Sequence, residues 1–236
     1  MKKLIVFFIF CLLEVSSKAY INIYPLKFDK RIDKGGEVQE FVLTNITDKE
    51  QRYRVYVEND NKGNDMSKWS EIYPENITLK PGDQKKVLFF VKSPPNTKNG
   101  EYTAILGIKE LEVPKSKKDK TLKVLSNLKM TLYGYIGELS DKIQLKNIDI
   151  KINTGIITNL SGEVRNIGEK ISEIEIYFGS KKQKDQYIGE ARIKVNEQID
   201  LQDIEVDLSK FKVDKNMYIE IYEKNEGKLL VKKKIN

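Results

Sequence analysis

Residues 121–133 read TLKVLSNLKMTLY, a stretch in which apolar and polar side chains alternate almost without interruption. Successive side chains of a β-strand point to opposite faces of its sheet, so a period of two predicts a strand with one apolar face. The residues on that face are Leu122, Val124, Ser126, Leu128, Met130 and Leu132. The predicted strand is longer than the typical length of about five or six residues.

The same period of two recurs along the rest of the chain, with turn residues about every ten positions. Pro25 interrupts the first predicted strand, over 21–28, which is typical of an edge strand that switches between two sheets. No segment keeps a helical period, and each half of the chain offers about seven short strands. The sequence therefore predicts an all-β protein with two immunoglobulin-like β-sandwich domains in tandem.

The boundary between the two halves is expected near residues 134–142, where two glycines precede a polar Ser-Asp-Lys run. We predict an N-terminal domain over 20–138 and a C-terminal domain over 139–236.

A cleavable signal peptide is predicted over residues 1–19. Lys2 and Lys3 precede an apolar run over 4–13, and small residues at Ser17 and Ala19 have the spacing that signal peptidase recognises. The apolar run is about half as long as a membrane-spanning helix, and no second apolar span follows it. We therefore expect an exported protein with no integral membrane segment after cleavage.

The composition argues against catalysis. The chain has no histidine, and its one cysteine, Cys11, lies within the predicted signal peptide. General-base pairings, thiol chemistry and most transition-metal sites therefore lack their usual side chains, so we expect no enzyme, metal or other cofactor. The formal net charge of +7 is spread over interleaved charges, and only 115–120 is locally basic, so nucleic acid is not an expected partner.

Four stretches, taken in their order and spacing, resemble one known family. They are the first strand with its proline (20–28), FVLTN (41–45), IYPENITLKPGDQ (72–84), and IKELEVP followed by a lysine-rich loop and the long strand (108–133). In these stretches the chain resembles the periplasmic pilus-assembly chaperones, the PapD-like family. The resemblance covers mainly residues 20–135, and the second domain matches by position and strand count only.

The resemblance implies a periplasmic chaperone that donates an edge strand to pilin-like or surface-fibre subunits and delivers them to an outer-membrane assembly pore, the usher. Leu122, Val124, Leu128 and Met130 would fill the open core of a subunit that lacks its last strand. Ser126 is a weak filler in this row.

The residues themselves leave two interpretations of the long strand open. A strand with one apolar face is ordinarily a half-buried strand of its own sandwich. An exposed edge with alternating apolar residues is an aggregation hazard, unless a partner pairs with it.

The family also grips the carboxylate at the C-terminus of its client, using an arginine of the first strand and a lysine of the long strand. Here the lysine position falls on Thr131 and the arginine position falls near Ile23. The nearest cations are Lys129 and Lys27, which we predict as the carboxylate anchor, although without the bidentate geometry of arginine. The alternative for both lysines is ordinary surface charge.

A second function class remains open from the sequence. Some exported surface proteins carry two such domains and bind cell-wall polymer or a surface partner. Those proteins usually end in a membrane segment and a basic tail, whereas this sequence ends in KKKIN with no apolar span before it.

Overall fold

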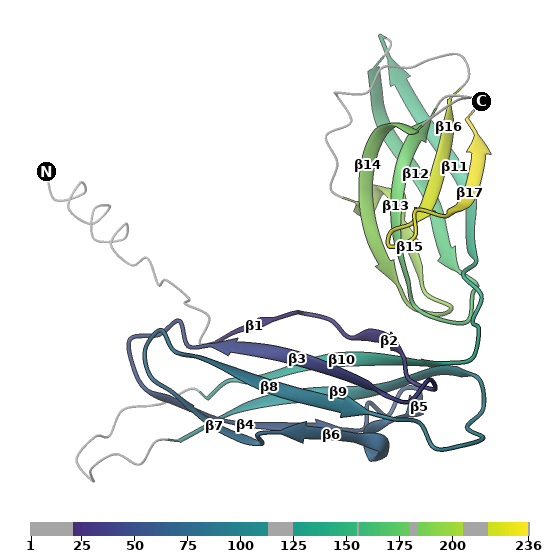
Figure 1. Ribbon diagram of the computed structural model, residues 1–236. Coiled ribbons are helices and arrows are strands. Elements are labelled where there is room, and N and C mark those ends of the chain that lie inside the picture. Colours follow the sequence, from purple (N-terminus) through teal and green to yellow (C-terminus); the bar gives the residue numbers. More distant parts are fainter. Residues whose placement is uncertain (1–20, 113–124, 155, 180–183, 205–216, 236) are drawn as a thin grey trace, which may run out of the picture.

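The computed structural model describes residues 21–112, 125–154, 156–179, 184–204 and 217–235. Within these residues the chain forms strands β1 to β17 and two short 3₁₀ turns, Ser67–Trp69 and Leu201–Asp203. The prediction of an all-β protein with two sandwich domains is confirmed (Figure 1). The predicted signal peptide lies outside the described residues, and so do Leu122 and Val124.

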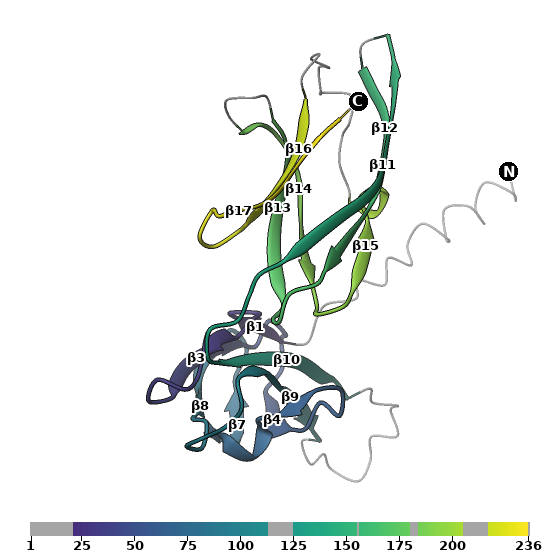
Figure 2. The ribbon, with the colours of Figure 1, turned by 90° about the vertical axis from the view of Figure 1, so that its right-hand side faces the viewer.

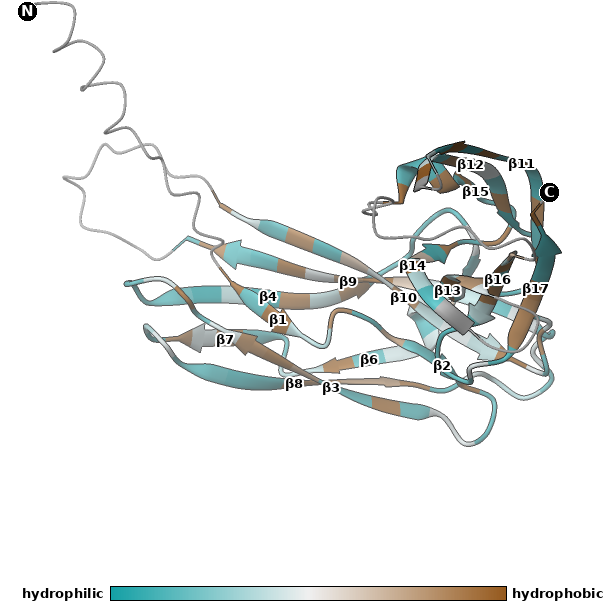
Figure 3. Ribbon diagram, turned by 90° about the horizontal axis from the view of Figure 1, so that it is seen from above, coloured by the Kyte–Doolittle hydropathy of each residue, from teal (hydrophilic) through white to brown (hydrophobic). Residues whose placement is uncertain are grey.

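Two sheets face each other in the first domain. One sheet has the order β1 (Asn22–Tyr24), β3 (Glu37–Thr44), β8 (Gln84–Val91) and β6 (Ser70–Tyr73). The other has the order β2 (Asp29–Arg31), β10 (Asn127–Ile136), β9 (Gly100–Leu111), β4 (Gln51–Glu58) and β7 (Asn76–Leu79), with β5 (Asn64–Asp65) pairing beside β9. Apolar and polar residues alternate along β4 and β9 in Figure 3, and the apolar side chains form one core between the sheets.

The first strand divides between the two sheets of this domain, as Pro25 predicts. β1 pairs with β3 in one sheet, and β2 pairs in parallel with the end of β10 in the other. Proline has no N–H to donate to a ladder, so the chain leaves the first sheet where Pro25 stands. Ile23 and Phe28 on either side of it are buried in the core.

The second domain has the same construction. β11 (Ile143–Asn153), β12 (Ile156–Asn166) and β15 (Gln198–Asp200) form one sheet. β14 (Lys184–Ile193), β13 (Ser172–Gly179), β16 (Tyr218–Glu223) and β17 (Leu229–Lys234) form the other. A separate apolar core fills the space between them.

Both domains use the same buried asparagine at a turn. The Asn45 amide donates to the carbonyls of Lys49 and Leu79, at 2.7 and 3.0 Å, and its oxygen accepts the Thr47 N–H. Asn166 makes the corresponding bonds in the second domain, to Lys170 and Ile193 at 2.8 and 2.9 Å. Each side chain thus satisfies backbone groups that burial would otherwise leave without a partner.

The two domains stand at an angle and together form an L (Figures 1 and 2). The junction end of the first domain holds β2, the end of β10 and the start of β9, since Ile136 pairs with Gly100. Across the junction, the Ile171 N–H donates to a Glu101 carboxylate oxygen at 2.5 Å. No helix in the described part of the chain is long and apolar enough to cross a membrane.

Candidate functional site

β10 is an edge strand over most of its length. β9 pairs along all of it, whereas β2 pairs only with Tyr133–Tyr135. On the same side of the sandwich, β1 is the edge strand of the opposite sheet. No described strand covers residues 127–132 of β10 on this side. We call the side of the first domain between β1 and Asn127–Leu132 the open side (Figure 1).

The register of β10 determines which of its backbone groups face the open side. The Glu110 N–H of the chain beside it donates to the Ser126 carbonyl at 2.8 Å, so residue 126 bonds toward β9. The Tyr133 N–H donates to the Phe28 carbonyl, also at 2.8 Å, on the other side of the strand. Backbone groups alternate in direction along an antiparallel strand. Asn127, Lys129 and Thr131 therefore present N–H and C=O groups to the open side.

The side chains of the other residues of β10 point toward the core, and their burial increases along the strand. Leu128 is 39% exposed, Met130 packs against the core while partly exposed, and Leu132 is fully buried. Leu26, in the segment between β1 and β2, is 71% exposed and adds apolar surface to the same side of the sandwich. Of the four predicted donor residues, the structure places Leu128 and Met130 on one face.

The two lysines predicted as a carboxylate anchor pair with different carboxylates. Lys129 pairs with Glu58 of β4 at 2.5 Å, on the outer face of the sheet, and this hydrogen bond raises the pKa of Lys129. Lys27 pairs at 2.7 Å with Glu173 of the second domain. In this structure each lysine is thus engaged by a different carboxylate.

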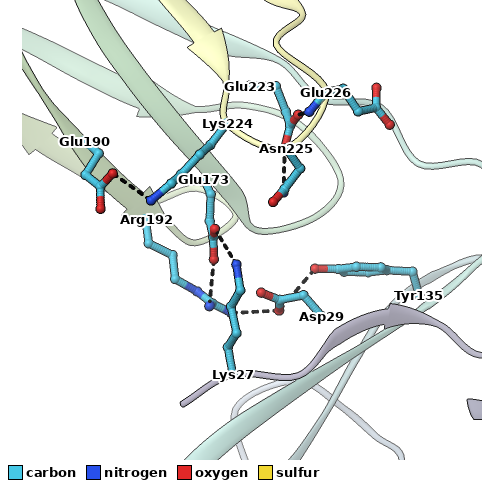
Figure 4. Close-up of polar contacts among 10 residues, drawn as sticks. All are labelled: Lys27, Asp29, Tyr135, Glu173, Glu190, Arg192, Glu223, Lys224, Asn225 and Glu226. Atoms are coloured by element: carbon cyan, nitrogen blue, oxygen red, sulfur yellow. Dashed lines mark hydrogen bonds and ion pairs between the residues drawn. The ribbon is translucent and has the colours of Figure 1, made fainter. Parts of the chain in front are cut away.

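Arg192, on β14 of the second domain, is a junction residue that no sequence pattern predicts. Its guanidinium donates to Asp29 at 2.7 Å and to Glu173 at 3.0 Å (Figure 4). It also lies 5.1 Å from the centre of the Tyr133 ring. Lys27 and Arg192 thus share the Glu173 carboxylate. A cavity of about 370 Å³ lies here, lined by Lys27, Glu173, Glu190, Ala191, Arg192 and Lys224.

Two carboxylates of the first domain are partly buried at the junction. Burial raises the pKa of Asp29, against the lowering effect of Arg192, and its carboxylate accepts the Tyr135 hydroxyl at 3.4 Å. Burial also raises the pKa of Glu101, which the hydrogen bond from the Ile171 N–H partly offsets. Desolvation penalises the charged form of both groups.

Replacing Glu101 with glutamine should make the protein more stable at pH 7. Burial raises the pKa of Glu101 in the folded protein, so the folded protein binds this proton more tightly than the unfolded chain does. Stability is therefore lost as the pH rises from the ordinary carboxylate range through the folded pKa. Glutamine removes the charge and keeps an oxygen that can accept the Ile171 N–H.

Urea unfolding of Glu101→Gln and the unchanged protein between pH 4 and pH 7 measures this effect. The gain should be greatest at pH 7, should shrink as the pH falls through the raised folded pKa, and should be lost below about pH 4.3, where the carboxyl is protonated in both states. A variant that is less stable than the unchanged protein at pH 7 would show that the Glu101 charge stabilises the junction.

The described residues contain no group of three or more acidic, histidine or cysteine side chains that could hold a metal ion. The distinguishing features of the site are a free strand edge, a row of apolar side chains whose burial increases along β10, and a charged junction beside it. This arrangement can bind an extended polypeptide strand.

No protein-family model matches the chain, and a comparison with curated protein sequences finds no match either. Among solved structures, the class 5 fimbriae chaperone CfaA is similar over 92% of this chain and 99% of its own, at 15% identity and a TM-score of 0.46. The YadV chaperone is similar over 92% and 100%, at 10% identity and a TM-score of 0.46. The SafB chaperone of Salmonella enterica, in complex with the SafA pilin, is similar over 93% and 98%, at 10% identity and a TM-score of 0.47.

Proposed function

We propose that the protein is a chaperone that binds incomplete pilus or surface-fibre subunits by donating strand β10. The observation that carries this proposal is the free edge of β10 over Asn127–Leu132, with apolar side chains at alternate positions. A strand of a client that pairs there gains main-chain hydrogen bonds, while the alternate side chains enter its core.

The two interpretations of the long strand apply to different parts of β10. Leu132 is fully buried, and β2 pairs with the following residues, so this end belongs to the sandwich of its own domain. Leu128 is partly exposed at the other end, where the edge is free. One end thus fixes the strand, and the other end presents it to a client.

The donor row that we propose is Leu122, Val124, Leu128 and Met130. Lys129 does not block strand pairing, because its side chain turns to the outer face and pairs with Glu58. Many edge strands carry an inward-pointing charged side chain, which prevents another chain from pairing with them. The inward-pointing positions of this edge, Leu128 and Met130, are apolar, so they leave the edge able to pair with a client strand.

Location and delivery follow from the resemblance in the sequence. We propose that the predicted signal peptide directs the protein to the periplasm, and that an outer-membrane usher receives the bound subunit.

Lys27 and Lys129 remain the proposed anchor for a client carboxylate. Each must leave its present partner, Glu173 or Glu58, before it can bind another carboxylate. An incoming carboxylate would thus exchange one ion pair for another, so we expect this contact to select the position of the client more than to add affinity.

Replacing Leu128 with glutamate tests the proposal. A carboxylate forced into an apolar core without a partner costs several kcal/mol, so subunit binding should weaken by about 100-fold or more. The free chaperone should stay folded, because the position is partly exposed in it. The measurements are thermal unfolding and recovery of the subunits that co-purify with the unchanged protein from the periplasm, identified by mass spectrometry.

Asn127→Glu provides the matched control, because it adds the same charge on the opposite face of the same strand. It should keep its subunits. If Leu128→Glu unfolds by itself, Leu128 belongs to the core of its own domain, and if it keeps its subunits, β10 is not the donor. If neither the unchanged protein nor any variant recovers subunits, and the unchanged protein binds cell-wall polymer, the result supports the alternative function as a surface module.

A further inference from the structure

Ser126 is the polar residue that interrupts the apolar row of the long strand, and three hydrogen bonds join it to Glu110 of β9. The Glu110 N–H donates to the Ser126 carbonyl at 2.8 Å. The Ser126 N–H and the Ser126 hydroxyl both donate to one carboxylate oxygen of Glu110, at 3.1 and 3.2 Å. The residue that precedes β10 is thus bound to the end of β9 by the backbone and the side chain of a single glutamate.

These bonds depart from the regular ladder between β9 and β10. Residues that stand opposite each other in an antiparallel pair normally exchange two backbone hydrogen bonds. At Glu110 and Ser126 the second bond goes to the Glu110 side chain, and the regular register begins at the next pair, Lys109 and Asn127. The Glu110 carboxylate therefore closes the ladder where the chain enters β10, two residues after Val124.

A carboxylate is an expensive side chain at this position. Leu106 and Ile108, the preceding inward-facing residues of β9, are each 1% exposed, and so is Glu110. A buried carboxylate costs stability unless its hydrogen bonds compensate for the lost hydration. An apolar residue with a regular backbone bond would need no such compensation. The choice of glutamate is therefore better explained by the hold on Ser126 than by the packing of the core.

We propose that Glu110 is a positioning residue for the donor strand, and that it fixes Ser126 where the strand becomes free to pair with a client. This inference rests on the proposed function. Residues 127–132 have a ladder on one side only, so few bonds keep the beginning of this edge extended. A strand that is already ordered when the client arrives avoids the entropy cost of ordering during binding. Hydrogen bonds to a carboxylate are stronger than those between neutral groups, so a glutamate suits this task.

Replacing Glu110 with alanine tests the inference. The probe is the subunit that co-purifies with the unchanged protein, labelled and exchanged from each variant onto an excess of unlabelled unchanged protein. We expect release to be about tenfold faster from Glu110→Ala, because variants of one interface differ mainly in their release rates. Glu110→Gln should release the subunit at close to the original rate, because its amide oxygen can accept the same two bonds from Ser126.

Glu220→Ala is the matched control. Glu220 is also a buried glutamate, 2% exposed, but it lies on β16 of the second domain, where it accepts the Tyr222 hydroxyl. Its replacement removes a buried carboxylate of the same kind without touching β9 or β10. The subunit should therefore leave Glu220→Ala at the original rate.

Hydrogen exchange of the free variants measures the positioning without a client. The amide hydrogens of Leu128 and Met130, which bond to β9, should exchange faster in Glu110→Ala than in the unchanged protein. The amide hydrogens of β3 and β8, in the opposite sheet, should keep their original rates. A loss of overall stability would instead accelerate exchange throughout the first domain.

The outcomes separate this inference from the proposed function. If Glu110→Ala releases the subunit at the original rate while Leu128→Glu fails to hold it, β10 is the donor and Glu110 does not position it. If Glu110→Ala and Glu220→Ala accelerate release equally, or if exchange rises throughout the first domain, Glu110 contributes only to overall stability and the inference is wrong. If no subunit co-purifies with the unchanged protein, both proposals are overturned.

Ser126→Ala decides the question if Glu110→Ala does not fold. It removes only the hydroxyl bond to Glu110, at a partly exposed position, and keeps the backbone bonds. We expect release from Ser126→Ala to be about threefold faster than from the unchanged protein. Release at the original rate would overturn the inference.

Discussion

Replacing Thr131 with proline is expected to abolish subunit binding and leave the chaperone folded. The backbone N–H of Thr131 faces the open side, so proline removes a donor from the free edge without removing a bond to β9. Proline is tolerated in an edge strand when its missing N–H would face solvent. The client would lose one ladder bond and would meet the proline ring where its backbone must approach.

Thr131→Ala is the control, because it keeps the N–H and removes only the side chain. We expect Thr131→Ala to recover subunits as the unchanged protein does, whereas Thr131→Pro should recover few or none. Circular dichroism and thermal unfolding would confirm that both variants are folded. Equal recovery by both would mean that this edge makes no main-chain bonds with the client.

Replacing Arg192 with methionine should have the largest effect on the junction between the domains. Asp29 and Glu173, whose side chains are 18% and 13% exposed, would lose the guanidinium that they share. Glu173 keeps its ion pair with Lys27, but Asp29 loses its ion-pair partner while it remains partly buried, at a cost of about 2 kcal/mol. For a protein of this size, that cost corresponds to a fall of roughly 4–8 °C in the unfolding midpoint.

Small-angle scattering should also show a wider range of angles between the domains of Arg192→Met. Arg192→Lys is the control, because it keeps the charge but cannot reach two carboxylates and stack on Tyr133 in the same way. The unfolding midpoint and the range of angles of Arg192→Lys should lie between those of Arg192→Met and those of the unchanged protein. Unchanged scattering and unfolding in Arg192→Met would show that other contacts hold the junction.

The alternation of side chains was sufficient to predict the fold class. A period of two in 121–133 predicts a strand with one apolar face, and the full burial of Leu132 and the partial burial of Met130 in β10 agree with it. Pro25 predicts that the first strand switches sheets, because the missing N–H is a property of the residue wherever it stands. Asn45 likewise marks the turn after β3, where its amide bonds two carbonyls.

The candidate site was only partly predictable. The sequence places Leu128 and Met130 on one face, but it does not show where β2 stops covering β10, which depends on how far the first strand runs before it reaches the second sheet. The range of the free edge, Asn127–Leu132, therefore appears only in the folded domain.

The charged residues at the junction between the domains also could not be assigned their partners from the sequence. Lys27 and Lys129 are close in the sequence to the positions that the resembled family uses, yet in the folded protein they pair with Glu173 and Glu58. Arg192 is 163 residues from its partner Asp29. Nothing in the local pattern around Arg192 distinguishes it from other outward-facing charges of a strand. The sequence by itself determined the strands and their apolar faces, because side-chain period and proline chemistry are local. The free edge and the partners of the charged residues were decided by the tertiary structure, because they depend on which strands and domains become neighbours.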